Sequence, residues 1–290
     1  MAQKSREKRL VKGPGRLQVI ATPIGNLNDL STRAHQALAE ADLVAAEDTR
    51  HTLGMLQAIG VSKPMVSLHA YNEGQRVPDL LARLSAGEVI ALVSDAGTPL
   101  LSDPGFELVS AAAAAGFEVR VIPGPSAITA ALAVAGLPTS RFCFEGFLPS
   151  RSRERRTELA RLARETRTLV FFEAPHRIAE TLADMVSEFG GERRAVVARE
   201  LTKTHETIYR GSLSELVGLS ANDANFQRGE ITLVVSGAEE VASIVDTQML
   251  KRAVELLAKE LPPGRAASIA AQLTGASRSE AYALIQKADD

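Results

Sequence analysis

Short apolar runs alternate with longer segments of helical period along most of this chain, and this alternation limits the folds it can adopt. In the first half the runs lie at 17–21, 43–46, 89–93 and 117–122. Short apolar runs bounded by turn residues are typical of buried strands. Strands that alternate with helices form βαβ units, so the sequence predicts an α/β fold with a largely parallel sheet.

The same pattern restarts after Leu137-Pro138. Strand-like runs now lie at 141–144, 168–172, 194–198, 205–211 and 230–235. Of these, 205–211 has the character of an edge strand. Residues 151–167 form a predicted helix with seven arginines and three glutamates. We therefore predict two α/β domains, at 17–138 and 139–240.

The two ends of the chain have a different character. Residues 1–16 form a predicted basic tail, which is either solvated or in contact with RNA. Residues 245–290 contain no strand-like run and predict short helices, two of which are joined by a glycine turn at 274–276. This arrangement resembles a helix-turn-helix, although a small packing bundle would have the same pattern.

Composition excludes several classes of protein. The formal net charge of −2 over 290 residues excludes a uniformly basic nucleic-acid coat, but not local basic patches. A single cysteine, Cys143, excludes an internal disulfide framework and fits a reducing, cytoplasmic compartment. No apolar run is long enough to span a membrane, so we expect no membrane partner. The histidines are scattered without metal-ligand spacing. Asp48 next to Glu47, and Asp95 with Asp103, could hold magnesium, but a turn or helix-cap role is favoured for these aspartates, so we expect no metal.

Loops rich in Gly, Pro and charged residues follow six of the predicted strands. Ligands of parallel α/β sheets bind beyond the carboxyl ends of the strands, so these loops together predict a site. Gly25, Gly97 and Gly124 lack a Cβ and allow backbone to approach a ligand closely. The backbone amides at 97–98 and 126–127 are candidates for binding a carboxylate or a ribose. Neither a GxGxxG nor a P-loop motif is present, which disfavours a dinucleotide or triphosphate site.

Eight segments give a more specific signal. They read LQVIATPIGNLNDLS (17–31), AAEDTRHT (45–52), HAYNE (69–73), VSDAGTPLLSDPG (93–105), IPGPSA (122–127), FCFEGFLPSR (142–151), FFEAPHRI (171–178) and ARELTKTHE (198–206). In this order they resemble the tetrapyrrole methylase superfamily and, within it, the ribosomal RNA small subunit methyltransferase I family of 2′-O-ribose methyltransferases. The first loop, TPIGNLND, differs from the GxGxGD-like loop of the wider superfamily, which argues against a corrin or sirohaem methylase.

The resemblance implies a fold, a cofactor and a product. The fold would be two α/β domains of the tetrapyrrole methylase type, with S-adenosylmethionine folded into the cleft between them. The product would be 2′-O-methylcytidine at position 1402 of 16S rRNA, made by a homodimer on free 16S rRNA or on the small ribosomal subunit. The predicted cofactor-binding residues are Pro23, Gly25, Asp95, Gly97, Thr98, Ser126, Ala127, Phe172 and Leu201.

The chemistry suggests further residues. A ribose hydroxyl is a weak acid, so a nearby base, or a cation that stabilises the developing alkoxide, would help methyl transfer. The candidate bases are Glu47, Asp48 and Glu73. The candidate cations are Lys203, Arg50 and Arg177. Of these we predict Asp48, Glu73 and Lys203 to be catalytic. A loop ion pair or a helix cap is an equal alternative for each of them.

The arginine-rich helix is the predicted contact for RNA phosphates. The predicted RNA-binding residues are Arg50, Arg153, Arg155, Arg156 and Arg177. A solvated helix face is the alternative for this helix. Two other functions stay open: a C-methyltransferase for a tetrapyrrole precursor, which the low aromatic content of 4% disfavours, and a nucleic-acid-binding module without catalysis, which would not need six such loops.

Overall fold

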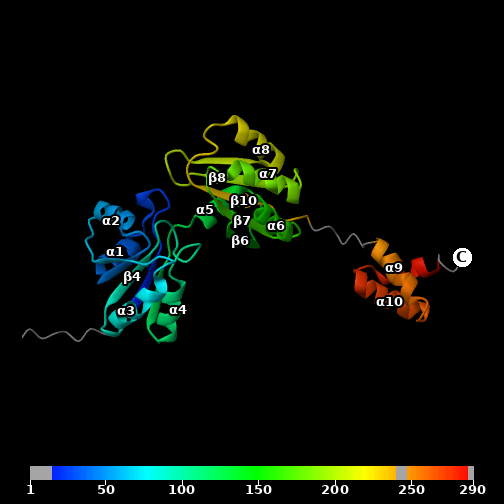
Figure 1. Ribbon diagram of the computed structural model, residues 1–290, viewed down its shortest axis with the longest axis horizontal. Helices are drawn as coiled ribbons and strands as arrows, with labels where there is room; N and C mark the ends of the chain where they lie inside the picture. Colours follow the sequence, from blue (N-terminus) through cyan, green and yellow to red (C-terminus); the bar gives the residue numbers. More distant parts are fainter. Residues whose placement is uncertain (1–14, 240–246, 287–290) are drawn as a thin grey trace, which may run out of the picture. The chain divides into compact units, whose positions relative to one another are not determined.

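The computed structural model describes residues 15–239 and 247–286, and the described residues form two five-stranded sheets and a separate group of helices (Figure 1). All strands of the first sheet are parallel, in the order β3-β2-β4-β1-β5. They are β1 (Arg16–Ile20), β2 (Leu43–Ala46), β3 (Met65–Ser67), β4 (Val89–Val93) and β5 (Glu118–Ile122). The predicted parallel sheet is confirmed here. The sequence pattern missed β3, because a run this short has no visible period.

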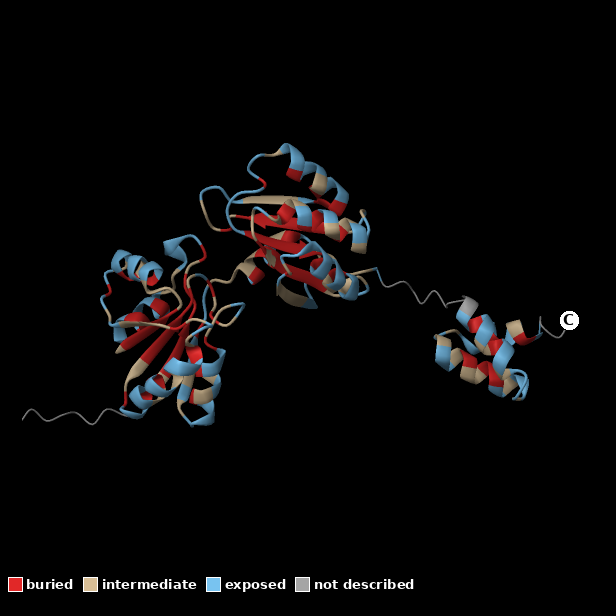
Figure 2. Cartoon of the chain, viewed as in Figure 1, coloured by how far each residue is buried: buried red, intermediate tan, exposed pale blue. Residues whose placement is uncertain are grey.

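Helices cover both faces of the first sheet. They are η1 (Leu27–Asp29), α1 (Thr32–Glu40), α2 (Thr49–Ala58), α3 (Glu73–Ser85) and α4 (Phe106–Ala114). Leu38 of α1 and Leu56 of α2 pack on one face, and Leu84 of α3 and Leu108 of α4 pack on the other. The central strands are therefore buried on both sides, as Figure 2 shows, which explains their nearly continuous apolar runs.

The second sheet is mixed. Its order is β6-β7-β10-β8-β9, and β10 is antiparallel to both of its neighbours. The strands are β6 (Phe142–Phe147), β7 (Thr168–Glu173), β8 (Arg194–Arg199), β9 (Thr207–Ser212) and β10 (Ile231–Val235). The prediction of a largely parallel sheet is wrong for this half. The connection 200–206 is too short for a crossover helix, so β9 turns back along β8. The predicted edge position of this strand is confirmed.

Four helices flank the second sheet: α5 (Ala127–Ala135), α6 (Ser152–Leu162), α7 (Ile178–Phe189) and α8 (Leu213–Asn222). The arginine-rich helix α6 is shorter than predicted and ends at Leu162. α6, α7 and α8 share a core on one face, whereas α5 packs on the opposite face against Val170 and Val196. α5 precedes Pro138 in the chain, yet it packs against the second sheet because nearly all of its side chains are apolar.

The described residues up to Gly237 form one compact unit, and those from 247 on belong to a second. The second unit contains α9 (Thr247–Leu257), α10 (Pro263–Thr274) and α11 (Arg278–Gln286), which pack around a core of small and aliphatic side chains. The predicted glycine turn is present: Gly275 has a φ of 72° and ends α10. Ser277 and Glu280 form reciprocal hydrogen bonds at the start of α11. The predicted tail lies outside the described residues apart from Gly15 and Arg16. Among the helices described, none is both long and apolar enough to cross a membrane.

Candidate active site

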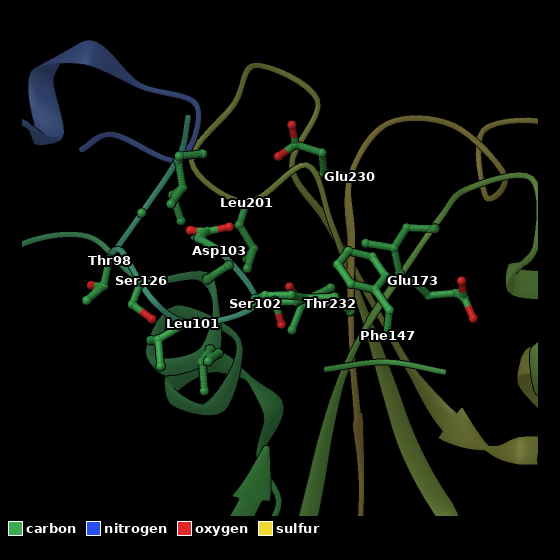
Figure 3. A pocket seen from close by; sticks show the side chains of 18 of the residues that line it. Thr98, Leu101, Ser102, Asp103, Ser126, Phe147, Glu173, Leu201, Glu230 and Thr232 are labelled. Carbon is green, nitrogen blue, oxygen red and sulfur yellow. The ribbon is translucent and has the colours of Figure 1, made fainter. Parts of the chain in front are cut away.

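A cavity of about 330 Å³ lies in the larger unit, between loops of the first sheet and strand ends of the second (Figure 3). This volume is within the range of roughly 300–1,000 Å³ that small-molecule sites occupy. The carboxyl ends of β6, β7 and β8 meet the start of β10 at this edge, because β10 runs in the opposite direction. Six of the nine predicted cofactor residues line the cavity: Gly97, Thr98, Ser126, Ala127, Phe172 and Leu201.

The loop after β4 forms one wall. Gly97 has a φ of 81°, and its N–H and C=O exchange hydrogen bonds with Thr22 at 3.0 and 2.9 Å. The Thr98 hydroxyl donates to the Pro125 carbonyl at 3.1 Å. The expectation that the Gly97 amide binds a ligand is therefore wrong, because Thr22 already accepts its proton. Leu100 and Ser102 have left-handed φ values of 73° and 71°, which strain this loop at the cavity.

The amino end of α5 forms a polar corner of the cavity. Ser126 is the N-cap residue and makes no side-chain cap hydrogen bond, and Ser126, Ala127 and Ile128 all line the cavity. The first turn of a helix exposes N–H groups and carries the positive end of the helix dipole. This corner therefore suits a carboxylate or another anionic group.

Apolar side chains form the remaining wall. Ile24 and Leu201 are buried beside Phe172, which packs against Phe144 and Phe147 with ring centroids 4.9 and 5.6 Å apart. Such a surface suits a flat ring system. Pro23, Gly25 and Asp95 do not line the cavity themselves, although Pro23 and Gly25 flank Ile24 in the chain.

Asp103 brings a carboxylate to the cavity wall. Burial, together with the nearby Glu47 and Asp95 carboxylates, raises the pKa of Asp103 to about 6 against the lowering effect of a hydrogen bond from Ser94. Burial and Asp95 also raise the pKa of Glu47. No group of three or more His, Cys, Asp or Glu side chains in the described part of the chain is arranged to hold a metal ion.

The predicted catalytic residue Asp48 makes local structural contacts outside the cavity. It is the N-cap of α2, where its Oδ1 accepts from the Arg50 backbone N–H at 2.8 Å and its Oδ2 from the Arg50 guanidinium at 2.7 Å. These hydrogen bonds hold the pKa of Asp48 well below its usual range. A group so weakly basic is a poor acceptor for a hydroxyl proton. Arg50 itself is exposed.

Glu73 is buried, with 6% of its surface exposed, and lies away from the residues that line the cavity. Its Oε1 accepts the Leu108 backbone N–H at 3.1 Å. Leu108 lies in the first turn of α4, whose N-cap residue, Gly105, has no side chain to do this. Glu73, on α3, therefore accepts a hydrogen bond from the first turn of α4 and acts as its cap. Of the two expected roles for Glu73, this contact supports a helix cap and not a catalytic base.

Lys203 lies at the margin of the cavity. Its Nζ pairs with Glu200 at 2.9 Å and with Glu230, which lines the cavity, at 3.2 Å. Burial lowers the pKa of Lys203, but the hydrogen bonds to these two carboxylates outweigh it, so the net shift is upward. The residue is thus a paired cation that joins two loops.

Of the predicted RNA-binding arginines, Arg155 and Arg177 make structural hydrogen bonds, whereas Arg153 and Arg156 are exposed. Arg155 is only 1% exposed, and its Nε donates to Asp184 at 2.7 Å, so a role in phosphate binding is wrong for this residue. Arg177 donates to the Leu148 and Pro149 carbonyls at 2.7 and 3.0 Å and so fixes the turn that follows β6. Arg153 and Arg156 are exposed on α6, where Arg156 pairs with Glu188 at 2.8 Å.

Comparison with models of protein families identifies the family of this chain. A family model described as tetrapyrrole (corrin/porphyrin) methylases matches residues 16–217. The chain belongs to this family. A second model, described as RsmI C-terminal HTH domain, matches residues 245–288, and it agrees with the helix-turn-helix pattern of the smaller unit. This member of the tetrapyrrole methylase family is a methyltransferase.

Named relatives are similar over nearly the whole chain. "Ribosomal RNA small subunit methyltransferase I" of Xylella fastidiosa (strain Temecula1) is 52% identical over 93% of this chain and 98% of its own. The proteins of that name from Pseudomonas aeruginosa and Escherichia coli O157:H7 are 50% and 46% identical, over 92% of this chain and 95% and 93% of their own.

Solved structures of the family share the fold. Uroporphyrin-III C-methyltransferase from Thermus thermophilus has a TM-score of 0.53 at 21% identity, and the methyltransferase CobJ has 0.57 at 21%. Each alignment covers 77% of this chain and 95% of the solved one. A Thermus thermophilus uroporphyrin-III C-methyltransferase has also been solved with S-adenosylhomocysteine.

Sequence reasoning did not assign several cavity residues to the cofactor or catalytic site. From the sequence, Asp103 is a candidate only for a magnesium ligand beside Asp95 or for a turn residue, because it belongs to the SDPG segment, where an aspartate before Pro-Gly is typical of a turn. Glu230, Ile231 and Thr232 lie at the start of β10, and the assumption of a parallel sheet assigns that end of the strand to the wrong edge. An antiparallel reading of β10 would have found them.

Proposed function

We propose that this protein transfers a methyl group from S-adenosylmethionine to the 2′-hydroxyl of a cytidine ribose in 16S rRNA, at position 1402. The observation that carries the proposal is its 52% identity over nearly the whole chain to a protein named ribosomal RNA small subunit methyltransferase I. The match includes the small helical unit as well as the methylase fold. The solved uroporphyrin-III C-methyltransferase of Thermus thermophilus is far less similar, at 21% identity.

The residues of the cavity fit the proposed cofactor. S-adenosylmethionine supplies a methyl group on a sulfonium, which is already activated for transfer. The amino end of α5, at Ser126 and Ala127, would bind its carboxylate. Phe172 and Leu201 would contact its adenine. A Cβ on Gly97 would lie 3.2 Å from Cγ2 of Ile24, so only glycine keeps this wall as it is.

Asp103 is the proposed proton acceptor for the ribose hydroxyl. It lines the cavity, and its pKa of about 6 makes it ionised at neutral pH and more basic than an ordinary carboxylate. It takes the place of Asp48 and Glu73, whose carboxylates are engaged at the starts of α2 and α4. Lys203 is proposed to keep Glu200 and Glu230 in position at the cavity margin rather than to act on the ribose.

The RNA is proposed to contact exposed basic side chains and the helical unit. Arg153 and Arg156 of α6 would bind phosphates, because both are exposed on the helix that follows the turn after β6. The unit at 247–286 would dock on the ribosomal substrate. We further propose a homodimer, for which exposed apolar side chains of the first half such as Phe106 and Val121 would supply contact area.

Ribose-methylation mapping of 16S rRNA from cells that lack this protein tests the function. We expect the 2′-O-methyl group at cytidine 1402 to be absent, to return with the wild-type chain, and not to return with Asp103→Asn. Gly54→Ala is the matched control, because a methyl group at Gly54 meets no atom within 4 Å. A methyl group that persists without the protein contradicts the proposal. Methylation of a uroporphyrinogen by the purified protein would support the tetrapyrrole alternative instead.

A further inference from the structure

The ring of Phe147 is the outermost member of a three-ring cluster at the cavity. It lines the cavity and is 57% exposed, whereas Phe172 and Phe144 behind it are half-buried. The Phe147 and Phe172 rings are tilted by 57° at 5.6 Å, so Phe172 supports Phe147 from one side. An exposed aromatic ring on the wall of a cavity is a surface on which a flat ligand can stack.

A β-bulge turns this ring toward the cavity. Phe144 pairs with Val170 and Phe147 with Phe172, and the register shifts between them, so Glu145 is extra in the strand. Val170 and Phe172 lie on one face, so the shift brings Phe147 to the face of Phe144. In a regular strand Phe147 would share the opposite face with Cys143. Gly146 makes the bulge with a φ of 67°.

The chain that follows Phe147 is fixed and becomes basic. Arg177 holds the Leu148 and Pro149 carbonyls. The exposed side chains of Arg151 and Arg153 follow at the start of α6. An exposed aromatic ring beside cations is the combination by which proteins bind single-stranded nucleic acid, with the ring under a base and the cations on phosphates.

We propose that Phe147 stacks on the base of the nucleotide whose ribose is methylated. The inference rests on the proposed function and adds a substrate contact to it. A base is joined to the same ribose as the reacting hydroxyl, so a nucleotide with its 2′-hydroxyl in the cavity has its base within reach of the cavity wall. Stacking uses the face of a base and not its edges, so Phe147 holds the nucleotide without selecting cytosine over uracil.

Methylation kinetics of Phe147 variants test this contact. The substrate is small ribosomal subunits from cells that lack the protein, with radiolabelled S-adenosylmethionine as donor. The variants are Phe147→Ala, Phe147→Leu and Phe147→Tyr. Phe142→Ala is the matched control, because Phe142 lies on the same strand, is 41% exposed and does not line the cavity. Calorimetry measures the Kd of each variant for S-adenosylmethionine.

We expect the Ala and Leu variants to lose about 5- to 150-fold in kcat/KM for the subunits, the range that one base stack supports. Tyr should restore the wild-type value, and the Kd for S-adenosylmethionine should not change. Leu keeps the apolar volume, so it separates loss of stacking from loss of folding. The inference is overturned if the Leu variant methylates as well as wild type, or if its main defect is a weaker Kd for the cofactor, which would place the ring over the adenine. Wild-type protein that methylates no subunits would instead refute the proposed function.

Discussion

The aliphatic stem of Lys203 lies directly against the backbone of Gly25, so that a Cβ at Gly25 would be 2.4 Å from Cγ of Lys203. Gly25 belongs to the loop after β1 and Lys203 to the loop after β8. The contact therefore joins the two halves of the larger unit beside the cavity. It explains a glycine at this position better than the expected contact with the cofactor does.

Gly25→Ala should lower the free energy of unfolding by about 1–3 kcal/mol, because the new methyl group overlaps the Lys203 stem. Lys203→Ala removes that stem, so the double variant should be more stable than the sum of the single effects indicates. Chemical denaturation of the four proteins measures this coupling. Additive effects would mean that the two residues do not touch in solution.

Glu73→Ala should destabilise the protein by about 1–3 kcal/mol, because it leaves the Leu108 N–H buried without an acceptor. Glu73→Gln keeps an oxygen in this position and should cost less. Both variants should retain the wild-type turnover per folded molecule, which urea titration and methylation assays together would measure. A Gln variant that is stable but inactive would restore Glu73 as a catalytic residue.

Asp103→Asn should abolish the acidic limb of the pH–rate profile near pH 6 and lower the rate. The same change should stabilise the fold at pH 7.5. Because the folded pKa of about 6 is above the ordinary 3.8, the folded state binds the proton more tightly, and ionised Asp103 is a destabilising charge at neutral pH. That cost fades as the pH falls through 6 and is absent below about 4.

After allowance for solvent screening we expect Asp103→Asn to add about 1 kcal/mol at pH 7.5, or about 2–4 °C in Tm. The gain should be lost in a melt at pH 4. Asp48→Asn is a useful contrast, because it should destabilise the fold. The pKa of Asp48 is lowered in the folded state, so its ionised form stabilises the fold at pH values above the ordinary pKa of an aspartate. An Asn variant that is less stable at pH 7.5 would contradict the assigned environment of Asp103.

Arg155→Met and the pair Arg153→Glu, Arg156→Glu should have separate effects. The first leaves the Asp184 carboxylate without its buried partner and should cost about 3–5 kcal/mol of stability. The pair should leave stability nearly unchanged, weaken RNA binding and lower the salt slope by roughly 0.7–0.9 for each lost phosphate contact. Filter binding over a salt series measures the slope. An unchanged slope would make α6 a solvated helix face.

A chain that ends at Glu239 should fold and bind S-adenosylmethionine as the full chain does, because the buried core of the helical unit is formed by its own residues. Methylation of ribosomal subunits should fall, mainly through a higher KM. Calorimetry and steady-state kinetics measure the two parts. If the shortened chain methylates like the full one, the helical unit is not a docking module.

Most of the strands could be predicted because each is a short run rich in apolar residues, and burial on both faces keeps the central strands β2 and β4 free of polar residues. The direction of the strands was predicted correctly in the first sheet but not in the second. β10 has the same apolar run whichever way it points, and its reversal depends on the short connection 200–206. The position of α5 was equally hidden, because its apolar sequence fits a place against either sheet.

Site residues could be predicted where a loop at the end of a strand requires a particular residue type. They were harder to predict where their role depends on contacts with residues distant in the sequence. Gly97 and Ser126 are found in loops that end strands, so sequence reasoning selected them. The acceptor role of Glu73 joins residues 35 positions apart. The basicity of Asp103 depends on burial, on Glu47 from the loop after β2 and on Asp95 eight residues earlier in its own loop. Neither leaves a periodic signal in the sequence.

The bulge in β6 makes the local register of that strand as important as its composition. A strand that kept Glu145 but lost the bulge would pair Glu145 with Phe171, place Gly146 opposite Phe172 and turn the Phe147 ring to the far face of the sheet. Every aromatic residue would be kept, yet the cavity would lose its outer ring. Related chains should therefore keep a residue that adopts a left-handed φ at position 146 more strictly than any particular side chain at position 145.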